Sequence, residues 1–406
     1  MKKKILFIKW NSFGNDYLIQ TLESMGYGVE YFDITEEDAD MRLGAAITEQ
    51  LLKKILSCNP EFVFSFNYYP VVAMACKAGR VKYISWIYDN PYIMLYSQTV
   101  FYDTNRIFVF DSSEVEYFRS LGVKNIYYMP MAAAVTNYDN IIPDHIHHEK
   151  YDSDVTFIGS MYSEKKQNLF RHLDDLDDYT QGFLNGLMEA QKNIYGMDIL
   201  EPTLIKSPKI VESMKKTCPI TAHGDGLETV EWTFSNYFLA RKVTAMERME
   251  IMQLLSDTVI KQREQKYSSP WKVRLFTPDK SFKLPGIENF GKIDYYSEAP
   301  YAIKCAKINL NISLRSIHSG IPLRCMDLFG CGGFVLTNYQ SDFMNHFVPG
   351  EDFVYYESIS QIPDLIDYYL THDDERTAIA ANGYNKAKKE FSYEKQLERI
   401  LEIASS

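Results

Sequence analysis

The residues between positions 315 and 333 offer the clearest chemistry in this sequence. A Ser-Gly turn there precedes Pro322, a residue suited to the first turn of a helix. Free amides at a helix start hold anions, and Arg315 and Arg324 add fork-shaped donors for phosphate oxygens. Asp327 lies about one turn below Arg324, where a carboxylate accepts hydrogen bonds from ribose hydroxyls. An Arg–Asp pair on an ordinary helix, with the later glycines as its C-terminal cap, explains the same residues equally well.

Three further residues, His318 of this segment and two residues outside it, are candidates for substrate contacts. Asp89 follows a strand-like segment, and its carboxylate is a candidate general base. The alternative for Asp89 is an Asx turn that begins before Pro91. His318 is either a phosphate donor or a satisfied polar residue of its loop. Gly14 lies in the loop at 11–15, where a single glycine does not make a dinucleotide-binding fingerprint.

Strand-like and helix-like segments alternate along the chain and must position these residues. The expected strands are 4–10, 29–32, 62–66, 83–88, 106–110 and 125–129, then 155–158, 273–276, 308–312, 334–337 and 353–355. Their continuous apolar runs are typical of strands buried on both faces. The stretch 167–257 carries no clear strand and predicts several helices instead. This alternation predicts an α/β protein with two doubly wound parallel sheets, whose ligands bind beyond the carboxyl ends of the strands.

Length and charge narrow the class of protein. A chain of 406 residues is too long for one ordinary core, so we expect two domains joined near 137–150. The net charge of −11 argues against nucleic-acid binding, which needs a basic surface. The apolar run Ile5–Ile8 is too short for a signal peptide or a membrane span, and no later run is long enough for a span. We therefore expect a cytoplasmic protein without a membrane span.

Cysteine and histidine residues give no metal-binding pattern. The six cysteines are scattered and form no Cys-x-x-Cys pair, so neither a disulfide framework nor a zinc site is expected. His145, His147 and His148 cluster after Pro143 without a cysteine or acidic pattern beside them, which favours a surface loop. We expect no metal site.

Several motifs resemble one family over nearly the whole chain. The sequence is similar to the CgeB-like (spore maturation protein) glycosyltransferases of GT-B type and to the N-terminal domain that accompanies them. The motifs that carry this resemblance are Ile8–Asn11, Phe64–Asn67, Trp86–Pro91, Asn309–Gln340, Val348–Glu351, Asp374–Tyr384 and Phe391–Tyr393. They are moderately specific for the fold and family and weakly specific for donor and acceptor.

The resemblance implies a GT-B fold, in which two Rossmann-like doubly wound domains face a cleft. The expected domains are 1–145 on the acceptor side, 151–390 for the nucleotide-sugar with a helical insertion at about 167–257, and a returning C-terminal helix at 391–406. The donor would be a nucleotide-sugar, with a UDP-sugar favoured, and the acceptor a protein, glycan or small molecule. Transfer would need no metal or other cofactor, and a homodimer is among the expected assemblies.

The resemblance also implies roles for individual residues. Asp327 matches the acidic position that holds the ribose, although that residue is usually Glu. The residues near the diphosphate would be Gly159, Ser160, Gly320, Ile321 and Arg324, with Arg315 and Lys242 as further cations. The alternative for Lys242 is a solvated helix face, which its neighbours Ala240 and Arg241 favour. Gly14 would make a close backbone approach to donor or acceptor, and Asp89 would act as a base if the reaction inverts configuration. Ser319 occupies the position of the first Glu in the Glu-x7-Glu pattern of retaining enzymes. Retaining and inverting chemistry therefore both stay open.

Three other functions compete with glycosyl transfer. A nucleotide-sugar epimerase shares the architecture but needs several acid and base groups crowded at the sugar, which the sequence does not indicate. A dehydrogenase is disfavoured because Gly-x-Gly-x-x-Gly is missing after the first strand. A non-catalytic nucleotide- or sugar-binding protein is favoured only by Asp327 in place of Glu.

Overall fold

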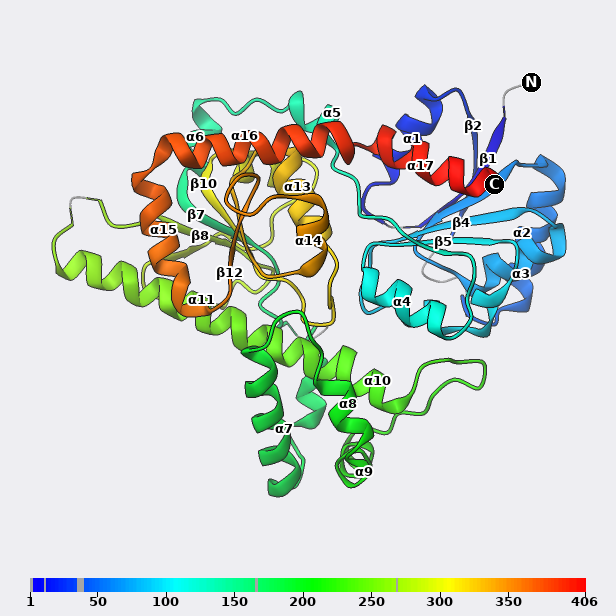
Figure 1. Cartoon of the computed structure of the whole chain (residues 1–406), viewed down its shortest axis with the longest axis horizontal. Helices are drawn as coiled ribbons and strands as arrows, with labels where there is room; N and C mark the ends of the chain where they lie inside the picture. The colour runs from blue at the N-terminus through cyan, green and yellow to red at the C-terminus, as the bar shows by residue number, and fades with distance from the viewer. Residues whose placement is uncertain (1–2, 11, 35–39, 165–166, 268) are drawn as a thin grey trace. The chain divides into compact units, whose positions relative to one another are not determined.

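The computed structural model describes residues 3–10, 12–34, 40–164, 167–267 and 269–406, which form two compact units (Figure 1). The first unit comprises Met1–Ala132, Ala222–Thr229 and Glu390–Ser406, and the second comprises Ala133–Thr221 and Val230–Lys389. The second unit thus begins before the linker expected near 137–150, and the C-terminal segment groups with the first unit. Asn11, part of a motif and a loop considered above, lies outside the described residues.

The first unit is built on a parallel sheet of order β2-β1-β3-β4-β5-β6. Its strands are β1 (Lys4–Lys9), β2 (Gly28–Asp33), β3 (Phe62–Phe66), β4 (Lys82–Ile87), β5 (Asn105–Val109) and β6 (Ile126–Tyr128). Ile5 aligns with Val29 of β2 on one side and with Phe62 of β3 on the other. The centre of β1 and all of β3 are buried, as the continuous apolar runs predict for a sheet covered on both faces.

The second unit is built on a parallel sheet of order β12-β11-β10-β7-β8-β9. Its strands are β7 (Ser153–Ile158), β8 (Val273–Phe276), β9 (Ile287–Asn289), β10 (Ala306–Asn311), β11 (Val335–Asn338) and β12 (Val354–Tyr356). The strand order reverses at β7, where Val155 aligns with Val273 of β8 and with Ile308 of β10. Two doubly wound sheets confirm the predicted fold class. The sequence missed β9, a three-residue edge strand without a buried residue or an apolar run.

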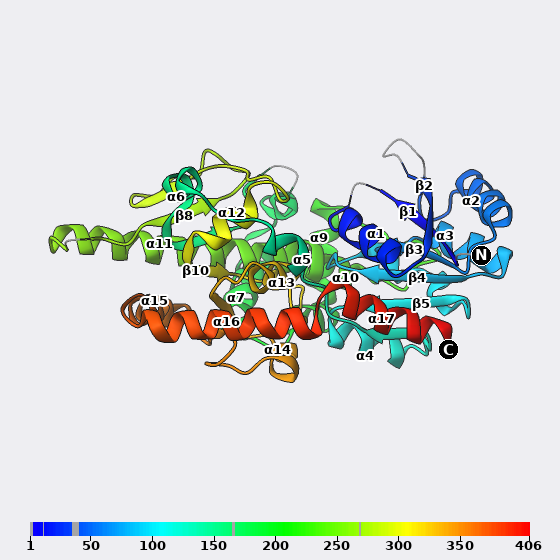
Figure 2. The same cartoon turned by 90° about the horizontal axis from the view of Figure 1, so that it is seen from above.

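Helices connect the strands of each unit. The first unit has α1 (Asn15–Ser24), α2 (Ala45–Cys58), α3 (Pro70–Gly79), α4 (Ser112–Ser120) and α17 (Tyr393–Ser405). The second has α5 (Val135–Asp139), α6 (His145–Tyr151), α12 (Ala299–Lys304), α13 (Leu323–Gly330), α14 (Ser341–His346), α15 (Ile362–Thr371) and α16 (Asp373–Glu390). Figure 2 shows α6 and α12 beside each other, and the two helices are in contact. No helix of the described chain combines the length and the apolar character that crossing a membrane requires.

The predicted surface loop at His145–His148 is wrong, because these residues lie in α6. Asp144 caps this helix by accepting hydrogen bonds from the backbone amides of Ile146 and His147. An aspartate after Pro143 is a helix-start signal, because its side chain can accept hydrogen bonds from the first free amides of a helix.

The predicted helical insertion follows β7 and includes α7 (Asp178–Lys192), α8 (Leu200–Ile205), α9 (Pro208–Thr217), α10 (Val230–Thr233) and α11 (Ala240–Glu264). Figure 1 shows α7, α8 and α9 gathered near one end of α11. The start of α11, with Val243, packs in the core of the insertion, whereas Ile251 and Leu255 pack against the sheet. The middle of α11, at Glu247 and Arg248, therefore lies where the insertion joins the sheet.

The loop Ala222–Thr229, which we call the strap, leaves the insertion and belongs to the first unit. Gly226 forms an antiparallel bridge with Ser97. The Nε of Arg42 lies 3.0 Å from an oxygen of Asp225, and its Nη2 lies 3.0 Å from an oxygen of Glu228. Arg42 and Glu228 are both buried, so removal of either partner would leave an uncompensated charge.

Glu114 of α4 carries a buried carboxyl group that predicts a pH-dependent stability. Its Oε1 accepts one hydrogen bond, from the Tyr96 hydroxyl at 3.4 Å, and its Oε2 has no partner. Burial, and secondarily Asp111, raise the pKa of Glu114 from 4.5 to about 8. The folded chain therefore holds this proton more tightly than the unfolded chain. The stability that the proton supplies is complete below pH 4.5 and is lost as the pH rises through about 8.

Replacing Glu114 by glutamine should remove this dependence. We expect the free energy of unfolding of the variant, minus that of the wild type, to rise with pH by at most about 1.4 kcal/mol per unit between these pKa values. Denaturant unfolding at pH 5, 7 and 9 measures it. A difference that stays constant across this range would contradict the raised pKa.

Candidate functional site

The carboxyl edge of the second sheet has the geometry of a ligand site. The strand order reverses at β7, and open α/β sheets bind ligands beyond the carboxyl ends of strands at such a point. The loops after β7 and β10 leave this edge, and they contain most of the residues that the sequence singled out. The strand pairing therefore places these two loops next to each other.

Gly159 and Ser160 begin the loop after β7. A Cβ on Gly159 would lie 2.8 Å from the Phe157 ring, so the close approach of this ring requires glycine. The Ser160 hydroxyl donates to Glu164 at 2.6 Å and accepts from the Tyr162 amide at 2.8 Å. Ser160 thus folds its own loop. Glu164, which the sequence did not single out, also accepts a hydrogen bond from Thr277 at 3.4 Å.

The helix predicted after the Ser-Gly turn is confirmed as α13, with Pro322 at its N-cap. No side chain of the described residues caps it, which fits a helix start that binds an anion. Gly320 and Ile321, just before it, are buried in the fold. Ser319 is buried as well, and its hydroxyl donates to Asp342 at 3.3 Å.

Arg315 is tied to the helical insertion. Its Nε donates to Glu247 at 2.8 Å, and its two Nη atoms donate to backbone carbonyls of residues 192 and 194. The guanidinium carbon lies 3.9 Å from the centroid of the Tyr195 ring, and 6% of the side chain is exposed. All three guanidinium nitrogens are engaged by the protein. This environment fits a structural role for Arg315, and its predicted contact with a diphosphate stays a prediction.

Two other predicted cations or donors lie next to the insertion. His318 lines a cavity of about 20 Å³ together with Arg315, Asn338 and Gln340. A space of this size holds a water molecule and no larger ligand. The Nζ of Lys242, a residue of the insertion, lies 4.6 Å from the centroid of the Phe170 ring.

Arg324 and Asp327 meet on α13, as their spacing predicts. The Arg324 Nη1 lies 3.5 Å from Asp327 Oδ2. Asp327 Oδ1 accepts from the hydroxyls of Tyr138 at 2.9 Å and Tyr295 at 2.7 Å. Asp327 Oδ2 and Arg324 Nη1 are buried and have no hydrogen-bond partner in the described chain. The two atoms thus form an ion pair in which each still lacks a hydrogen bond.

Burial raises the pKa of the Asp327 carboxyl, while the Arg324 charge and the two tyrosine hydroxyls oppose this rise. A buried carboxylate oxygen without a donor is unfavourable. A hydroxyl of a bound ligand would supply the missing hydrogen bond. The tyrosines that hold Oδ1, at positions 138 and 295, are distant in sequence, and no motif identified them.

Asp89 and Gly14 lie in the first unit, beyond the carboxyl ends of β4 and β1. Asn67 donates to Asp89 Oδ2 at 2.7 Å, and the Asn67 Oδ1 accepts from the backbone amide of Asp89 at 3.3 Å. A Cβ on Gly14 would lie 2.4 Å from the Tyr393 hydroxyl of α17, and its φ is 78°. Packing against α17 therefore accounts for this glycine. Asn67 falls within a resembling motif, but no role was predicted for it.

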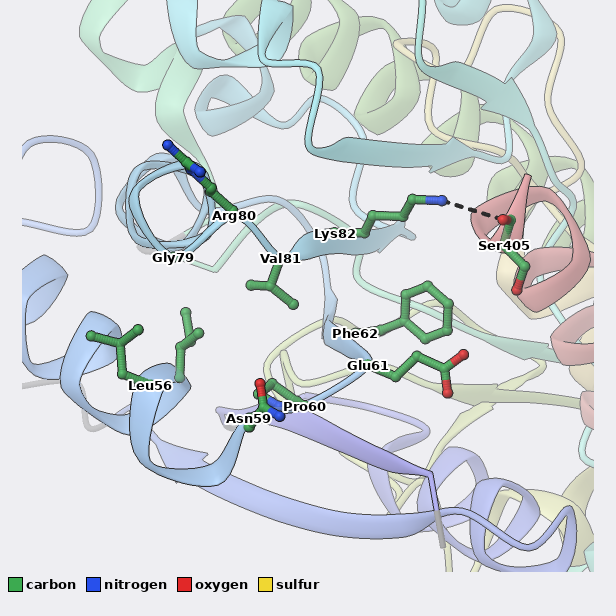
Figure 3. Close-up of a pocket in the computed structure, with 11 residues that line it drawn as sticks. Leu56, Asn59, Pro60, Glu61, Phe62, Gly79, Arg80, Val81, Lys82 and Ser405 are labelled. Atoms are coloured by element: carbon green, nitrogen blue, oxygen red, sulfur yellow. Dashed lines mark hydrogen bonds between the residues drawn. The ribbon is translucent and has the colours of Figure 1, made fainter. Parts of the chain in front are cut away.

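A cavity of about 350 Å³ lies at the opposite edge of the first sheet, at the amino ends of β3 and β4 (Figure 3). Lys82 donates from its Nζ to the backbone carbonyls of Ala404 and Ser405, and Arg80 and Leu56 line the same cavity. None of the predicted site residues lines it. Its position at the amino ends of the strands separates it from the expected ligand edge.

One group of side chains has the residue types of a metal site. Ligand atoms of His148, Asp152 and Cys305 lie within 4.8 Å of one another. Burial, and secondarily Asp152, raise the pKa of the Cys305 thiol to about 11, and the nearby Arg274 charge partly opposes this rise. A high thiol pKa disfavours the thiolate that binds metals. The site at β7 and β10 does not include this group.

Comparisons with known proteins agree with this architecture. Residues 248–402 match the family model described as glycosyl transferase-like. No curated protein sequence matches the chain. A glycosyltransferase from Rickettsia africae is similar in structure, with a TM-score of 0.56, 12% identity, and coverage of 100% of this chain and 98% of that chain.

Two further solved structures share the fold. Sucrose-phosphate synthase from Thermosynechococcus elongatus has a TM-score of 0.53 at 10% identity and covers 100% of this chain and 98% of its own. Anabaena HepE in complex with UDP-glucose has a TM-score of 0.52 at 10% identity and covers 99% of each chain. These likenesses confirm the expected GT-B fold. The glycosyl transferase-like segment at 248–402 lies within this fold, from α11 of the second unit to α17 of the first.

Proposed function

We propose that the chain is a glycosyltransferase, which takes a sugar from a nucleotide-sugar donor, with a UDP-sugar favoured, and transfers it to a protein, glycan or small-molecule acceptor. The observation that carries the proposal is the ion pair of Arg324 and Asp327 in the first two turns of α13. Its facing Nη1 and Oδ2 atoms lie 3.5 Å apart and make no hydrogen bond in the described chain. A diphosphate and a ribose offer the complementary groups. The similar fold of HepE, whose complex contains UDP-glucose, supports the same donor class.

The proposed roles follow from the chemistry of glycosyl transfer, which needs a stabilised leaving group and a positioned acceptor. Arg324 and the amides at the start of α13 stabilise the leaving diphosphate, and Asp327 holds the ribose. Asp89 remains our candidate general base for the acceptor hydroxyl, and its carboxylate accepts a hydrogen bond from Asn67. We assign no such role to Arg315, because its guanidinium is engaged by Glu247 and two carbonyls.

Other parts of the proposal rest on sequence resemblance and chemistry. We propose that the chain is a CgeB-like member, because its motifs extend from Ile8 to Tyr393. We also propose a cytoplasmic enzyme that transfers sugar without a metal, with arginine side chains neutralising the diphosphate. A homodimer is the assembly we would test first.

A panel of donors tests the function. We expect a UDP-, GDP- or dTDP-sugar to raise the melting temperature and to be slowly hydrolysed to the nucleoside diphosphate, while NAD does neither. Stabilisation by NAD alone would refute the nucleotide-sugar assignment. Nuclear magnetic resonance of the product sugar separates the alternatives, because an epimerase returns an inverted stereocentre in place of hydrolysis or transfer.

A further inference from the structure

Arg248 of α11 holds a buried positive charge at the switch point of the second sheet. Its Nη1 donates to the carbonyl oxygen of Ser160 after β7, and its Nη2 donates to that of Ile312 after β10 at 2.6 Å. A Cβ on Gly159 would lie 3.5 Å from the same Nη1. One guanidinium thus joins the loops that leave the two strands between which ligands of open α/β sheets bind.

This charge has no counter-ion in the described part of the chain. Arg248 is 8% exposed, no carboxylate of the described residues lies within 4.0 Å of its nitrogens, and its buried Nε has no hydrogen-bond acceptor. Its neighbour Glu247 is paired with Arg315 instead. The guanidinium carries more N–H groups than its two carbonyl bonds use. A buried charge without a partner is costly, so an anion that completes this site would be held strongly.

Aromatic rings stabilise the charge only in part. The guanidinium carbon lies 5.2 Å from the centroid of the Phe157 ring and 4.9 Å from that of Tyr162. Such cation–π contacts offset part of the cost of burying the charge. Tyr162 also has a φ of 58°, a conformation that non-glycine residues rarely adopt. The loop after β7 is therefore held in a specific shape around the cation.

We propose that Arg248 is the cation of a subsite for the donor's diphosphate, formed with the loops after β7 and β10. This inference rests on the proposed function, because a nucleotide-sugar brings the diphosphate. It adds a cation to those that the sequence predicted for the diphosphate, which were Arg315, Arg324 and Lys242. The insertion contributes Arg248 through α11, so it takes part in donor binding as well as in packing.

The test compares ligands with and without phosphate. Calorimetry measures the binding of UDP, uridine and inorganic pyrophosphate to the wild type, Arg248→Gln and Arg248→Lys. We expect Arg248→Gln to lose about ten- to a hundred-fold in affinity for UDP and for pyrophosphate, and to bind uridine as the wild type does. Arg248→Lys keeps the charge and should lose less affinity for UDP and pyrophosphate. If the glutamine variant does not fold, the lysine variant still tests the subsite.

Arg274→Gln is the matched control. Arg274 is also a buried arginine of the second unit and also donates to a backbone carbonyl, that of Lys150, but it pairs with Glu288 at 3.3 Å. Its replacement should lower the melting temperature and leave the ratio of UDP to uridine affinity unchanged. This control separates a general loss of packing from the loss of an anion-binding charge.

Two results would overturn the subsite. In the first, Arg248→Gln binds UDP with the same affinity as the wild type. In the second, Arg248→Gln loses as much affinity for uridine as for UDP, which would mean that Arg248 only holds the two loops together. If the wild type binds pyrophosphate but not UDP, and Arg248→Gln loses the pyrophosphate, the subsite stands and the UDP donor fails. If the wild type binds neither ligand, the subsite is refuted together with that donor.

Discussion

Replacing Arg315 by alanine is expected to lower the free energy of unfolding by about 3–5 kcal/mol. The substitution leaves Glu247 buried, with 1% of its side chain exposed, and removes its ion pair. The Tyr195 hydroxyl would remain as the donor to Glu247, at 2.6 Å. The backbone carbonyls of residues 192 and 194 would lose their donors as well. Denaturant unfolding monitored by circular dichroism measures the change.

Two variants make this prediction specific. Lys395→Ala removes an exposed pair with Glu398 and should change stability by less than about 1 kcal/mol. The double replacement Arg315→Met with Glu247→Leu removes both charges and should recover much of the loss. UDP affinity of the folded Arg315→Ala protein should stay near that of the wild type. A large loss of UDP affinity at normal stability would instead return Arg315 to the donor site.

Replacing Asp327 by asparagine is expected to weaken donor binding by about ten- to a hundred-fold. Asparagine keeps the size of the side chain and an oxygen for the hydroxyls of Tyr138 and Tyr295, but it removes the charge beside Arg324. The buried Oδ2 that we assign to the ribose would lose its strength as an acceptor. Calorimetry with UDP and the KM for the donor sugar measure the loss.

Asp352→Asn is a control for this prediction. Asp352 is a buried carboxylate of the same unit that pairs with Lys386 at 3.1 Å. Its replacement should affect stability and leave UDP affinity unchanged. Pyrophosphate should bind Asp327→Asn and the wild type alike, because the ribose contact is absent from both complexes. Equal UDP affinity of Asp327→Asn and wild type would refute the ribose role.

The sequence predicted the sheets better than it predicted the environment of each site residue. Apolar runs such as Ile5–Ile8 have a single explanation, a strand buried on both faces, and the structure has one there. The helix after Pro322 followed from a local signal that needs no distant partner. The edge strand β9 has no such signal, because a three-residue strand without a buried residue needs no apolar pattern.

Side-chain partners from distant segments could not be predicted. Arg315 was a phosphate candidate because the sequence does not show that Glu247, in the insertion, neutralises it. Arg248 was not predicted as a site residue, because the sequence does not show that its side chain is buried. A charged residue on a long helix usually faces solvent, and only the fold shows it buried between the loops after β7 and β10.

The strap has a consequence for how the protein can be divided. Neither unit is one continuous stretch of chain, because Ala222–Thr229 and Glu390–Ser406 complete the first unit. A fragment that ends at Ala132 would lack α17 and both carboxylates that neutralise Arg42. The two halves are therefore not independent modules that can be exchanged between enzymes at a single junction, and a donor-side graft would have to carry its own strap and C-terminal helix.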